Sequence, residues 1–297
     1  MGTTVGFVSE KGGVGKTTIC YHIAVALARY HDKSVLVVDG DYQRGGITGR
    51  FVPELIEQFR TRRIEETTLY DKFLQLYSAT DLTPDVDIRI TNESGIALLP
   101  ADPRLSQVTV DKIPTTNNIR ENTRSLWRHL SVLDVVLEQI RDEYDYVLVD
   151  SHPDINDLLH AIIYSCGYCV SPVKLDLQST VGVASAIEAI NDVNSDMEMV
   201  RNALDEEIVY ADTQYAGAIA TQAREYGPGT LKRTERTEYR RVSRTGPILE
   251  TFVTEGDGLR QAALDRCPVF DVRGQNAEKQ SEQLRQLTEE FVRRCPT

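Results

Sequence analysis

Residues 12–18 of the chain read Gly-Gly-Val-Gly-Lys-Thr-Thr, a run whose residue types and spacing suit the binding of phosphate. Glycines let backbone N–H groups wrap around phosphate oxygens, Lys16 would supply a charge for the β- and γ-phosphates, and the Thr17 hydroxyl suits a Mg²⁺ ligand. The strict phosphate-loop pattern begins with a glycine five residues before Gly15, and this chain has Glu10 there. A glycine-rich turn that binds nothing is the alternative. The apolar run before the loop and the helical pattern after it favour the phosphate site.

Five short apolar runs are candidates for the strands that would position this loop. Parallel strands covered by helices on both faces are apolar without alternation, and several of these runs have that pattern. They span residues 4–8, 34–38, 146–149, 168–171 and 216–220. Helical patterns adjoin most of them, at residues 19–29, 126–140 and 181–193. This alternation predicts an α/β fold with a doubly wound, mostly parallel sheet flanked by helices.

The composition indicates an acidic globular protein. Among its 297 residues, 45 Asp and Glu outnumber 33 Lys and Arg, for a net charge of −12, so any contact with nucleic acid must come from a local patch. No window approaches 18 consecutive apolar residues, no signal segment precedes the first strand, and five cysteines do not form a disulfide framework. We expect a cytoplasmic protein with a single domain, 1–297, because no linker or repeat divides the chain. Residues 50–92 and 112–124 look like insertions into it.

Residues 11–18 resemble the deviant Walker A loop of the ParA/MinD family of P-loop ATPases. The run Asp-Gly-Asp-Tyr-Gln at 39–43 is similar to the family's Asp-x-Asp-Pro-Gln switch, with Tyr42 in place of the proline. Residues 144–150 resemble its Walker B strand, and the Ser-Pro-Val run at 171–173 resembles its next switch strand. The resemblance covers most of the chain apart from the two insertions. It is closest to ParA-type, Soj-like partition ATPases without an N-terminal DNA-reading domain.

The resemblance implies a slow ATP hydrolase that works as a homodimer. Lys11 would reach across the interface to the partner's nucleotide, so that two ATP molecules are sandwiched between subunits, and Asp41 would position the attacking water. On these grounds the catalytic residues are Lys11, Lys16 and Asp41, and the Mg²⁺ ligands are Thr17, Asp39 and Asp150. The residues expected to bind ATP are Lys11, Gly12, Gly13, Val14, Gly15, Lys16, Thr17, Thr18 and Gln222.

Besides Tyr42, two residues and one three-residue run depart from the family pattern. Gln222 is the nearest amide to an asparagine that meets the adenine in the family, and residues 253–255, Val-Thr-Glu, replace an Ile-Pro-Arg run whose proline contacts the adenine. His152 stands where the family often has Thr or Pro after the Walker B aspartate. A catalytic histidine is one interpretation of it, and a loop histidine satisfied by its neighbours is the favoured one.

Cys166 and Cys169 have the spacing of a metal-binding or redox pair. A zinc site would need a second pair, which the sequence does not contain, and some relatives of this fold carry an iron–sulfur cluster on a cysteine pair shared across a dimer. Cys169 falls inside a predicted buried strand, where cysteine packs as a small apolar side chain. We therefore expect these cysteines to have a structural role.

A basic stripe is expected on the helix predicted at residues 230–244. At 100° per residue, four arginines fall within roughly 80° of one another, with Glu235 and Glu238 on the opposite side. Six cations minus two anions give the segment a net charge of +4. A solvated helix face usually mixes its charges, so the sorting favours a polyanion partner over a merely solvated helix. ParA proteins without an N-terminal DNA-reading domain bind DNA non-specifically through C-terminal basic residues. The residues expected to bind DNA are Lys232, Arg233, Arg236, Arg240, Arg241, Arg244 and Arg273.

These features predict a ParA-like ATPase that dimerises on ATP and binds DNA without sequence preference, on the nucleoid in the cytoplasm. With an adaptor protein, either ParB-like or specific to the cargo, it would position a plasmid, a chromosome region or another cargo. The alternatives are a MinD-like spatial regulator on a membrane surface and an iron–sulfur carrier of the same fold. The apolar stripe of Leu284, Leu287 and Phe291 argues for packing on the sheet rather than a membrane anchor, so we expect no membrane partner.

Overall fold

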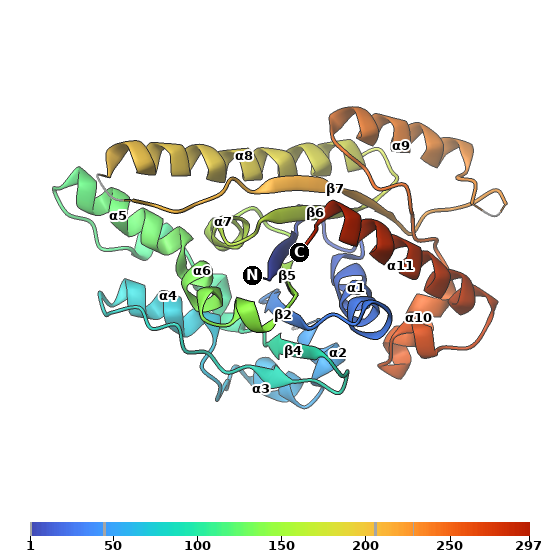
Figure 1. Cartoon of the computed structure of the whole chain (residues 1–297), viewed down its shortest axis with the longest axis horizontal. Coiled ribbons are helices and arrows are strands. Elements are labelled where there is room, and N and C mark those ends of the chain that lie inside the picture. The colour runs from blue at the N-terminus through green and yellow to red at the C-terminus, as the bar shows by residue number, and fades with distance from the viewer. Residues whose placement is uncertain (1, 44–45, 205–206, 228) are drawn as a thin grey trace.

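A seven-stranded sheet forms the centre of the computed structural model, which describes residues 2–43, 46–204, 207–227 and 229–297. The strands are β1 (Thr3–Phe7), β2 (Val35–Gly40), β3 (Arg89–Ile90), β4 (Ile96–Leu99), β5 (Tyr146–Ser151), β6 (Tyr168–Lys174) and β7 (Gln214–Thr221). Their order is β3-β4-β2-β5-β1-β6-β7, and every neighbouring pair is parallel except β3 with β4 (Figure 1). This topology confirms the predicted α/β fold.

Continuous apolar runs explain why β1, β2 and β5 lie in the middle of the sheet. Every residue of β2 and β5 is buried, because helices cover both faces. In the register of the sheet, Phe7 lies opposite Asp150, and Asp150 lies opposite Asp39. The three central strands therefore bring their carboxyl ends, and the acidic residues there, to one edge of the sheet.

Helices cover the sheet in two layers. They are α1 (Lys16–His31), α2 (Thr48–Phe51), α3 (Leu55–Thr61), α4 (Leu69–Tyr77), α5 (Ile119–Leu130), α6 (Val132–Glu138), α7 (Asp157–Tyr164), α8 (Ser179–Ala203), α9 (Arg233–Thr245), α10 (Asp257–Asp265) and α11 (Gln275–Arg294), with 3₁₀ helices η1 (Pro103–Gln107), η2 (Val110–Lys112), η3 (Arg141–Glu143) and η4 (Val269–Asp271). One core cluster joins α1 and α11 to one face, and another joins α4, α6, α7 and α8 to the other face (Figure 1). A third cluster attaches α9 to α8 and β7.

The stretch at 50–92 packs on the sheet, and its status as an insertion into the domain stays a prediction. It holds the end of α2, then α3, α4 and β3. Leu69, Phe73 and Leu76 of α4 are buried in the core cluster that covers one face of the sheet. This stretch therefore contributes apolar surface to the same core as the predicted strands.

The segment at 112–124 begins with the last residue of η2 and is a loop only from Ile113 to Asn118. The Asn118 side chain accepts a hydrogen bond from the backbone N–H of Arg120 and so caps α5. The helix expected at 126–140 consists of two helices, α5 and α6, which meet at Ser131. The sequence patterns do not predict β4 or α7.

The C-terminal apolar stripe packs inside the protein, as predicted. Leu284, Leu287 and Phe291 of α11 are fully buried in the cluster shared with α1 and the sheet. The Phe291 ring contacts Phe7 and Tyr146, with ring centroids 6.1 and 6.0 Å apart. Within the part of the chain that the structure describes, no helix has both the length and the apolar character needed to cross a membrane.

Phe291→Ala should lower the free energy of unfolding by about 3–5 kcal/mol, the range for removing a buried phenyl ring and leaving a cavity. Urea unfolding followed by circular dichroism would measure the loss. Arg293→Ala, on the exposed side of the same helix, should change that free energy by less than about 0.5 kcal/mol. Equal effects of the two substitutions would contradict the packing role of Phe291.

Candidate nucleotide site

The phosphate loop and both acidic motifs meet at the carboxyl edge of the sheet. β1 leads into the loop, and Asp39 and Asp150 lie at the ends of β2 and β5. The loop, the turn after β2 and the residue after β7 line a cavity of about 610 Å³. Its lining residues are Lys11, Gly12, Gly13, Val14, Gly15, Lys16, Thr17, Thr18, Asp41, Gln43, Gly46, Arg50, Pro153 and Gln222. Every residue predicted to bind ATP is among them, whereas Asp39 and Asp150 are buried outside this lining.

Two glycines give the loop its shape. Gly13 and Gly15 have φ angles of 76° and 91°, in the left-handed region that favours glycine. Thr221 Oγ1 donates to the Val14 carbonyl over 2.5 Å, and Gln222 Nε2 donates to the Gly13 carbonyl over 3.0 Å. In the described structure the loop N–H groups before α1 have no backbone partner. The N–H groups of residues 12–15 are therefore available to phosphate oxygens at the N-terminus of α1, whereas the Lys11 N–H donates to Ser9 Oγ over 3.3 Å.

Lys16 and Asp150 carry buried polar atoms without hydrogen bonds. The Lys16 ammonium nitrogen and both Asp150 carboxylate oxygens are shielded from solvent and have no partner within the described ranges. Burial lowers the pKa of Lys16, and the negative charge of Asp150 partly offsets this shift. Burial also raises the pKa of Asp150 to about 6, opposed by Lys16 and the nearby Thr17 hydroxyl. Buried polar groups are normally paired, so the set fits a phosphate at Lys16 and Mg²⁺ at the oxygens of Thr17 and Asp150.

Asp39 is held by protein donors. Its Oδ2 accepts hydrogen bonds from the Thr48 backbone N–H and hydroxyl over 3.0 and 2.7 Å, and its Oδ1 accepts from the Asp41 N–H over 3.0 Å. Burial, with the neighbouring charge of Asp150, raises the pKa of Asp39 to about 7. Asp39 therefore shapes the turn that carries Asp41, and its part in a Mg²⁺ shell stays a prediction.

The other two predicted catalytic residues lie at the rim of the cavity. Asp41 Oδ1 accepts a hydrogen bond from the Gln43 N–H over 2.9 Å. The Lys11 ammonium forms an ion pair with Asp176 over 2.8 Å, and the two side chains are 40% and 42% exposed. Asp176 lies between β6 and α8 of the same chain. The structure thus binds Lys11 internally, and its reach to a second chain stays a prediction.

His152 is only half satisfied by its neighbours, in contrast to the expectation of a fully paired loop histidine. Its buried ring stacks on Tyr42, with centroids 3.9 Å apart. Its Nδ1 accepts a hydrogen bond from the Asp154 N–H over 3.2 Å, but its buried Nε2 has no partner in the described part of the chain. Burial lowers the pKa of His152.

A second cavity, of about 290 Å³, adjoins the phosphate loop. The two cavities share Gly15, Thr18, Arg50 and Gln222. Residues 253–255, which replace the family's Ile-Pro-Arg, line the second cavity. The N–H groups of Val253 and Glu255 donate to the Ala220 and Ala223 carbonyls over 2.9 Å each. This second cavity lies where the nucleoside part of a nucleotide would fit. Gln222 binds the phosphate loop in this structure, and its contact with adenine stays a prediction.

Arg50 is a site residue that the sequence motifs do not reveal. It belongs to the four-residue helix α2 and lines both cavities. Its Nη2 donates to Thr18 Oγ1 over 3.3 Å, its guanidinium carbon lies 5.2 Å from the centroid of the Tyr21 ring, and its Nη1 is buried without a partner in the described structure. A guanidinium in this position can bind a phosphate or ribose oxygen. Only the tertiary fold brings it to the loop, so no local pattern could have identified it.

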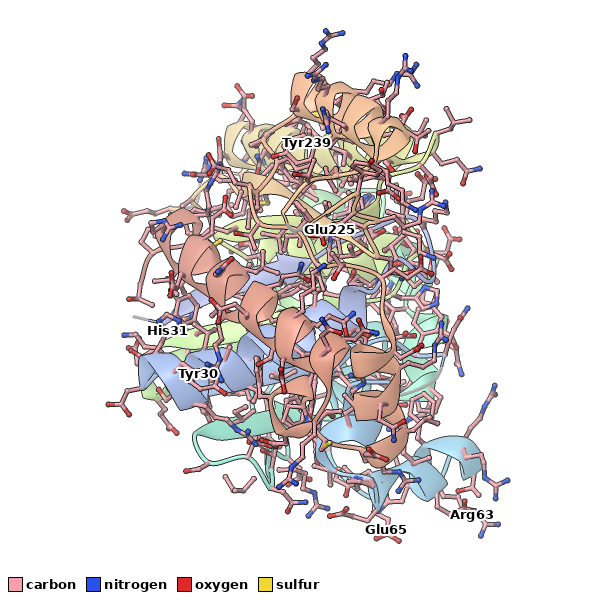
Figure 2. The ribbon with its side chains drawn as sticks, turned by 90° about the vertical axis from the view of Figure 1, so that its right-hand side faces the viewer. Tyr30, His31, Arg63, Glu65, Glu225 and Tyr239 are labelled. Atoms are coloured by element: carbon pink, nitrogen blue, oxygen red, sulfur yellow. The ribbon has the colours of Figure 1, made fainter. Side chains whose placement is uncertain are left out.

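Helix α9 presents its arginines to solvent and its glutamates to the protein. Glu235 and Glu238 are buried, and the four residues that we name the basic stripe, Arg233, Arg236, Arg240 and Arg244, are exposed. Figure 2 shows nitrogen-tipped side chains projecting outward around this helix, near Tyr239. The structure therefore has the sorted faces that the sequence predicts.

Three other residues of the predicted DNA-binding set lie outside the basic stripe. Arg241 forms an ion pair with Glu238 over 2.8 Å. Arg273 follows η4, which packs on α10 and α11, whereas α9 packs on α8. Lys232 is exposed and precedes the first residue of α9. Their contacts with DNA stay predictions.

Cys166 and Cys169 are buried together beside β1. A Cβ atom placed on Gly6 would lie 3.1 and 3.2 Å from their sulfur atoms, so the two thiols pack closely over this glycine. Burial raises the pKa of the Cys166 thiol well above its usual range. Protonated thiols inside a core behave as small apolar side chains. Their interior position does not suit a cluster shared across a dimer.

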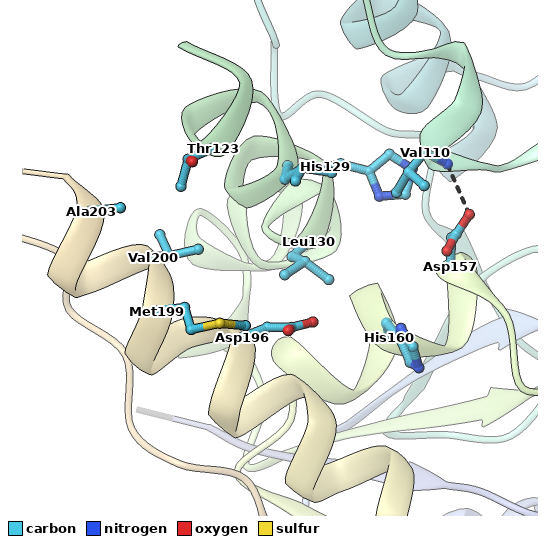
Figure 3. A pocket seen from close by; sticks show the side chains of 11 residues that line it. Val110, Thr123, His129, Leu130, Asp157, His160, Asp196, Met199, Val200 and Ala203 are labelled. Atoms are coloured by element: carbon cyan, nitrogen blue, oxygen red, sulfur yellow. Dashed lines mark hydrogen bonds between the residues drawn. The ribbon is translucent and has the colours of Figure 1, made fainter. Parts of the chain in front are cut away.

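A third cavity, of about 420 Å³, lies between α5, α7 and α8 (Figure 3). Apolar side chains such as Leu130 and Val200 line it together with His160. It shares no lining residue with the cavity at the phosphate loop. Asp157, the first residue of α7, accepts a hydrogen bond from the Val110 N–H over 2.8 Å at its edge. This cavity is therefore separate from the nucleotide site.

Comparison with known proteins supports the assignment that the motifs suggest. Residues 2–204 match the family model AAA_31, which describes an AAA domain. The chain is 26% identical over 191 residues to a ParA family protein of Chlamydia pneumoniae and 27% identical over 190 residues to the chromosome partitioning protein ParA of Caulobacter vibrioides. These alignments cover 63% and 64% of this chain and 66% and 62% of the relatives, so the match spans just under two thirds of their length.

Solved structures share the fold over nearly the whole chain. A variant of Cyanothece McdA in complex with ATP has a TM-score of 0.71 at 16% identity, over 98% of this chain and 96% of that one. Cobyrinic acid a,c-diamide synthase from Mycobacterium smegmatis, with bound ADP and magnesium, has a TM-score of 0.66 at 19% identity, over 99% and 95%. The family match covers more than half of the chain. The chain therefore belongs to the AAA domain family that the AAA_31 model describes, and its relatives in sequence include ParA family proteins.

Proposed function

We propose that this chain binds Mg²⁺ and ATP and hydrolyses ATP slowly, as a ParA-type ATPase. The observation that carries the proposal is the buried pair of Lys16 and Asp150, whose polar atoms have no partner in the described structure. Lys16 lines the cavity of about 610 Å³, and Asp150 lies outside this lining. Buried polar atoms destabilise a protein unless a partner completes their hydrogen bonds. The names of the relatives, ParA and chromosome partitioning protein, support the same activity.

The site residues have distinct roles in the proposed phosphoryl transfer. The loop N–H groups and Lys16 bind phosphate oxygens, and Thr17 and Asp150 hold Mg²⁺, with Asp39 as a candidate third ligand. When bound, Mg²⁺ neutralises charge that develops on the phosphates. Asp41 orients the attacking water from the rim of the cavity.

We infer that two chains face each other at the nucleotide, each giving Lys11 to the partner's ATP. Two exposed apolar side chains near the start of α8 support an interface there, since Leu177 is 78% and Val181 is 62% exposed. They follow Asp176, the internal partner of Lys11. A lysine supplied by the partner makes hydrolysis depend on dimerisation.

The ATP-bound dimer is proposed to bind DNA non-specifically through the basic stripe of α9 and to associate with the nucleoid. Its four arginines per chain are exposed, and the rest of the acidic chain would repel DNA. Hydrolysis then releases the DNA, and an adaptor protein couples this cycle to a plasmid, a chromosome region or another cargo. The stripe of α11 that a membrane anchor would expose is buried.

Lys16→Ala should weaken the binding of Mg²⁺-ATP by about a hundredfold or more, because the phosphates lose a charged hydrogen-bond donor in a buried site. Isothermal titration calorimetry would measure the affinity. Lys33→Ala is the control, because Lys33 does not line the cavity and forms an ion pair with Asp145 over 3.0 Å. The ATP affinity of this variant should equal that of the unmodified protein. Unchanged affinity in Lys16→Ala would place the phosphate site elsewhere.

Lys11→Ala should bind ATP as a monomer and lose hydrolysis, because no cross-subunit charge reaches the nucleotide. Size-exclusion chromatography with ATP and a phosphate-release assay would test both parts. Asp176→Asn removes the internal partner of Lys11 and keeps the lysine charge, so this variant should still dimerise and hydrolyse ATP. Normal turnover with an ATP-dependent dimer peak in Lys11→Ala would refute the sandwich arrangement.

Changing Arg240 and Arg244 to Glu together should weaken binding to all DNA sequences alike, because phosphate contacts carry no sequence information. For the unmodified dimer, about six to eight phosphate contacts predict a slope of log K against log salt on the order of −5 to −7. A salt titration of ATP-bound protein on two unrelated DNA sequences measures both quantities.

The matched control for this experiment changes Arg62 and Arg63 to Glu together. Both arginines are exposed and follow the last residue of α3. Figure 2 shows Arg63 at the end of the molecule opposite Tyr239 of α9. The control should keep its DNA affinity, and both double variants should keep ATP binding. Unchanged affinity in the Arg240/Arg244 variant would exclude the stripe, and strong preference for one sequence would exclude non-specific binding.

A further inference from the structure

Tyr42 and His152 form a contact between the two loops that flank the phosphate site. Both residues stand where the family pattern has other types, and their rings stack with centroids 3.9 Å apart and an interplanar angle of 15°. The Tyr42 hydroxyl donates to Asp154 Oδ2 over 3.2 Å and accepts from Asn156 Nδ2 over 3.3 Å. One tyrosine thus connects the turn after β2 to the segment after β5. A proline at this position would make neither the ring stack nor the hydrogen bonds.

The contacts of His152 indicate which ring nitrogen carries the proton. Its Nδ1 accepts from the Asp154 N–H over 3.2 Å, and an accepting nitrogen carries no hydrogen, so the neutral ring is protonated at Nε2. Asp154 Oδ2 also lies 3.3 Å from Nδ1. A proton on Nδ1 is therefore the alternative, and it would leave Nε2 as an acceptor.

The Nε2 atom of His152 faces Asp41. It is buried and lacks a partner in the described structure, and Asp41 Oδ1 lies 4.0 Å away. That distance is about 1 Å longer than a hydrogen bond. The Asp41 side chain is partly exposed, and its rotation can bring the two atoms within hydrogen-bond distance. A buried N–H donor beside an ionised acceptor gains a charge-assisted hydrogen bond when the gap closes.

We propose that His152 is a positioning residue for ATP hydrolysis, which donates from Nε2 to the Asp41 carboxylate and holds it toward the attacking water. This inference rests on the proposed function, because it assigns Asp41 the orientation of water. Asp41 Oδ1 already accepts the Gln43 N–H over 2.9 Å, and a second donor from the opposite loop fixes the carboxylate in two directions. The Tyr42 ring holds the imidazole in place for this bond.

Steady-state kinetics separate this role from simple packing. His152→Ala should lower kcat by about ten- to a hundredfold, the range for a lost hydrogen bond to an ionised group, with KM for ATP nearly unchanged. His152→Gln keeps an N–H donor near the same position and should restore most of kcat. Tyr42→Phe keeps the ring stack and should stay closer to the unmodified rate than Tyr42→Ala. His160→Ala, in the separate cavity of Figure 3, is the control and should leave kcat unchanged.

A double substitution tests whether His152 acts through Asp41. In an Asp41→Ala background, His152→Ala should cause no further loss of kcat, because the acceptor is already gone. Independent, multiplicative losses would overturn the proposal. So would a kcat in His152→Gln as low as that in His152→Ala.

The ring tautomer provides a readout that does not depend on hydrolysis. Long-range ¹H–¹⁵N NMR of the five histidines, with His152 assigned from its loss in His152→Gln, should show a protonated Nε2 and an unprotonated Nδ1. The reverse tautomer would overturn the inference even in an active enzyme. An enzyme without ATP turnover would instead refute the proposed function, whereas the NMR result still decides the geometry at His152.

Discussion

The unpaired polar atoms of Lys16 and Asp150 are the constraint on which the rest of the structure depends. A buried ammonium and a buried carboxylate without hydrogen bonds oppose folding, so they persist only where surrounding elements hold them. The parallel order β2-β5-β1 brings Asp39, Asp150 and the loop to one edge. The two apolar clusters that attach helices to both faces stabilise this edge. The packed core thus stabilises a site whose unpaired buried charges destabilise the folded protein.

The parts of the fold and site that are encoded locally could be predicted from the sequence. The loop, the turn after β2 and the Walker B strand are each a short run with its own spacing, and the central strands are continuous apolar runs. Arg50 and Asp176 could not be predicted as site residues, because they reach Thr18 and Lys11 only through tertiary contacts. β4 and α7 are short apolar segments, and such segments do not reveal whether they form helix or strand.

Contacts inside the protein explain why the glutamates of α9 lie on one side of the helix, apart from the proposed DNA contacts of its arginines. Buried Glu235 accepts hydrogen bonds from the Arg224 N–H and guanidinium over 2.6 and 2.7 Å, and Glu238 pairs with Arg241. The glutamates therefore anchor the helix, and the arginines on the other side remain exposed. The sequence pattern shows the sorting but not the internal pairing, since Arg224 lies outside the helix.

Asp176 would compete with the nucleotide of a second chain for Lys11. Asp176 is tethered to Lys11 by the fold, so its effective concentration is unaffected by dilution, whereas that of a second chain falls with dilution. A half-exposed ion pair contributes less than about 1 kcal/mol, so the lysine can change partners at small cost. The balance between the two partners then varies with the amount of protein. In the dimer proposed above, the Asp176 carboxylate between β6 and α8 would therefore raise the protein concentration needed for assembly.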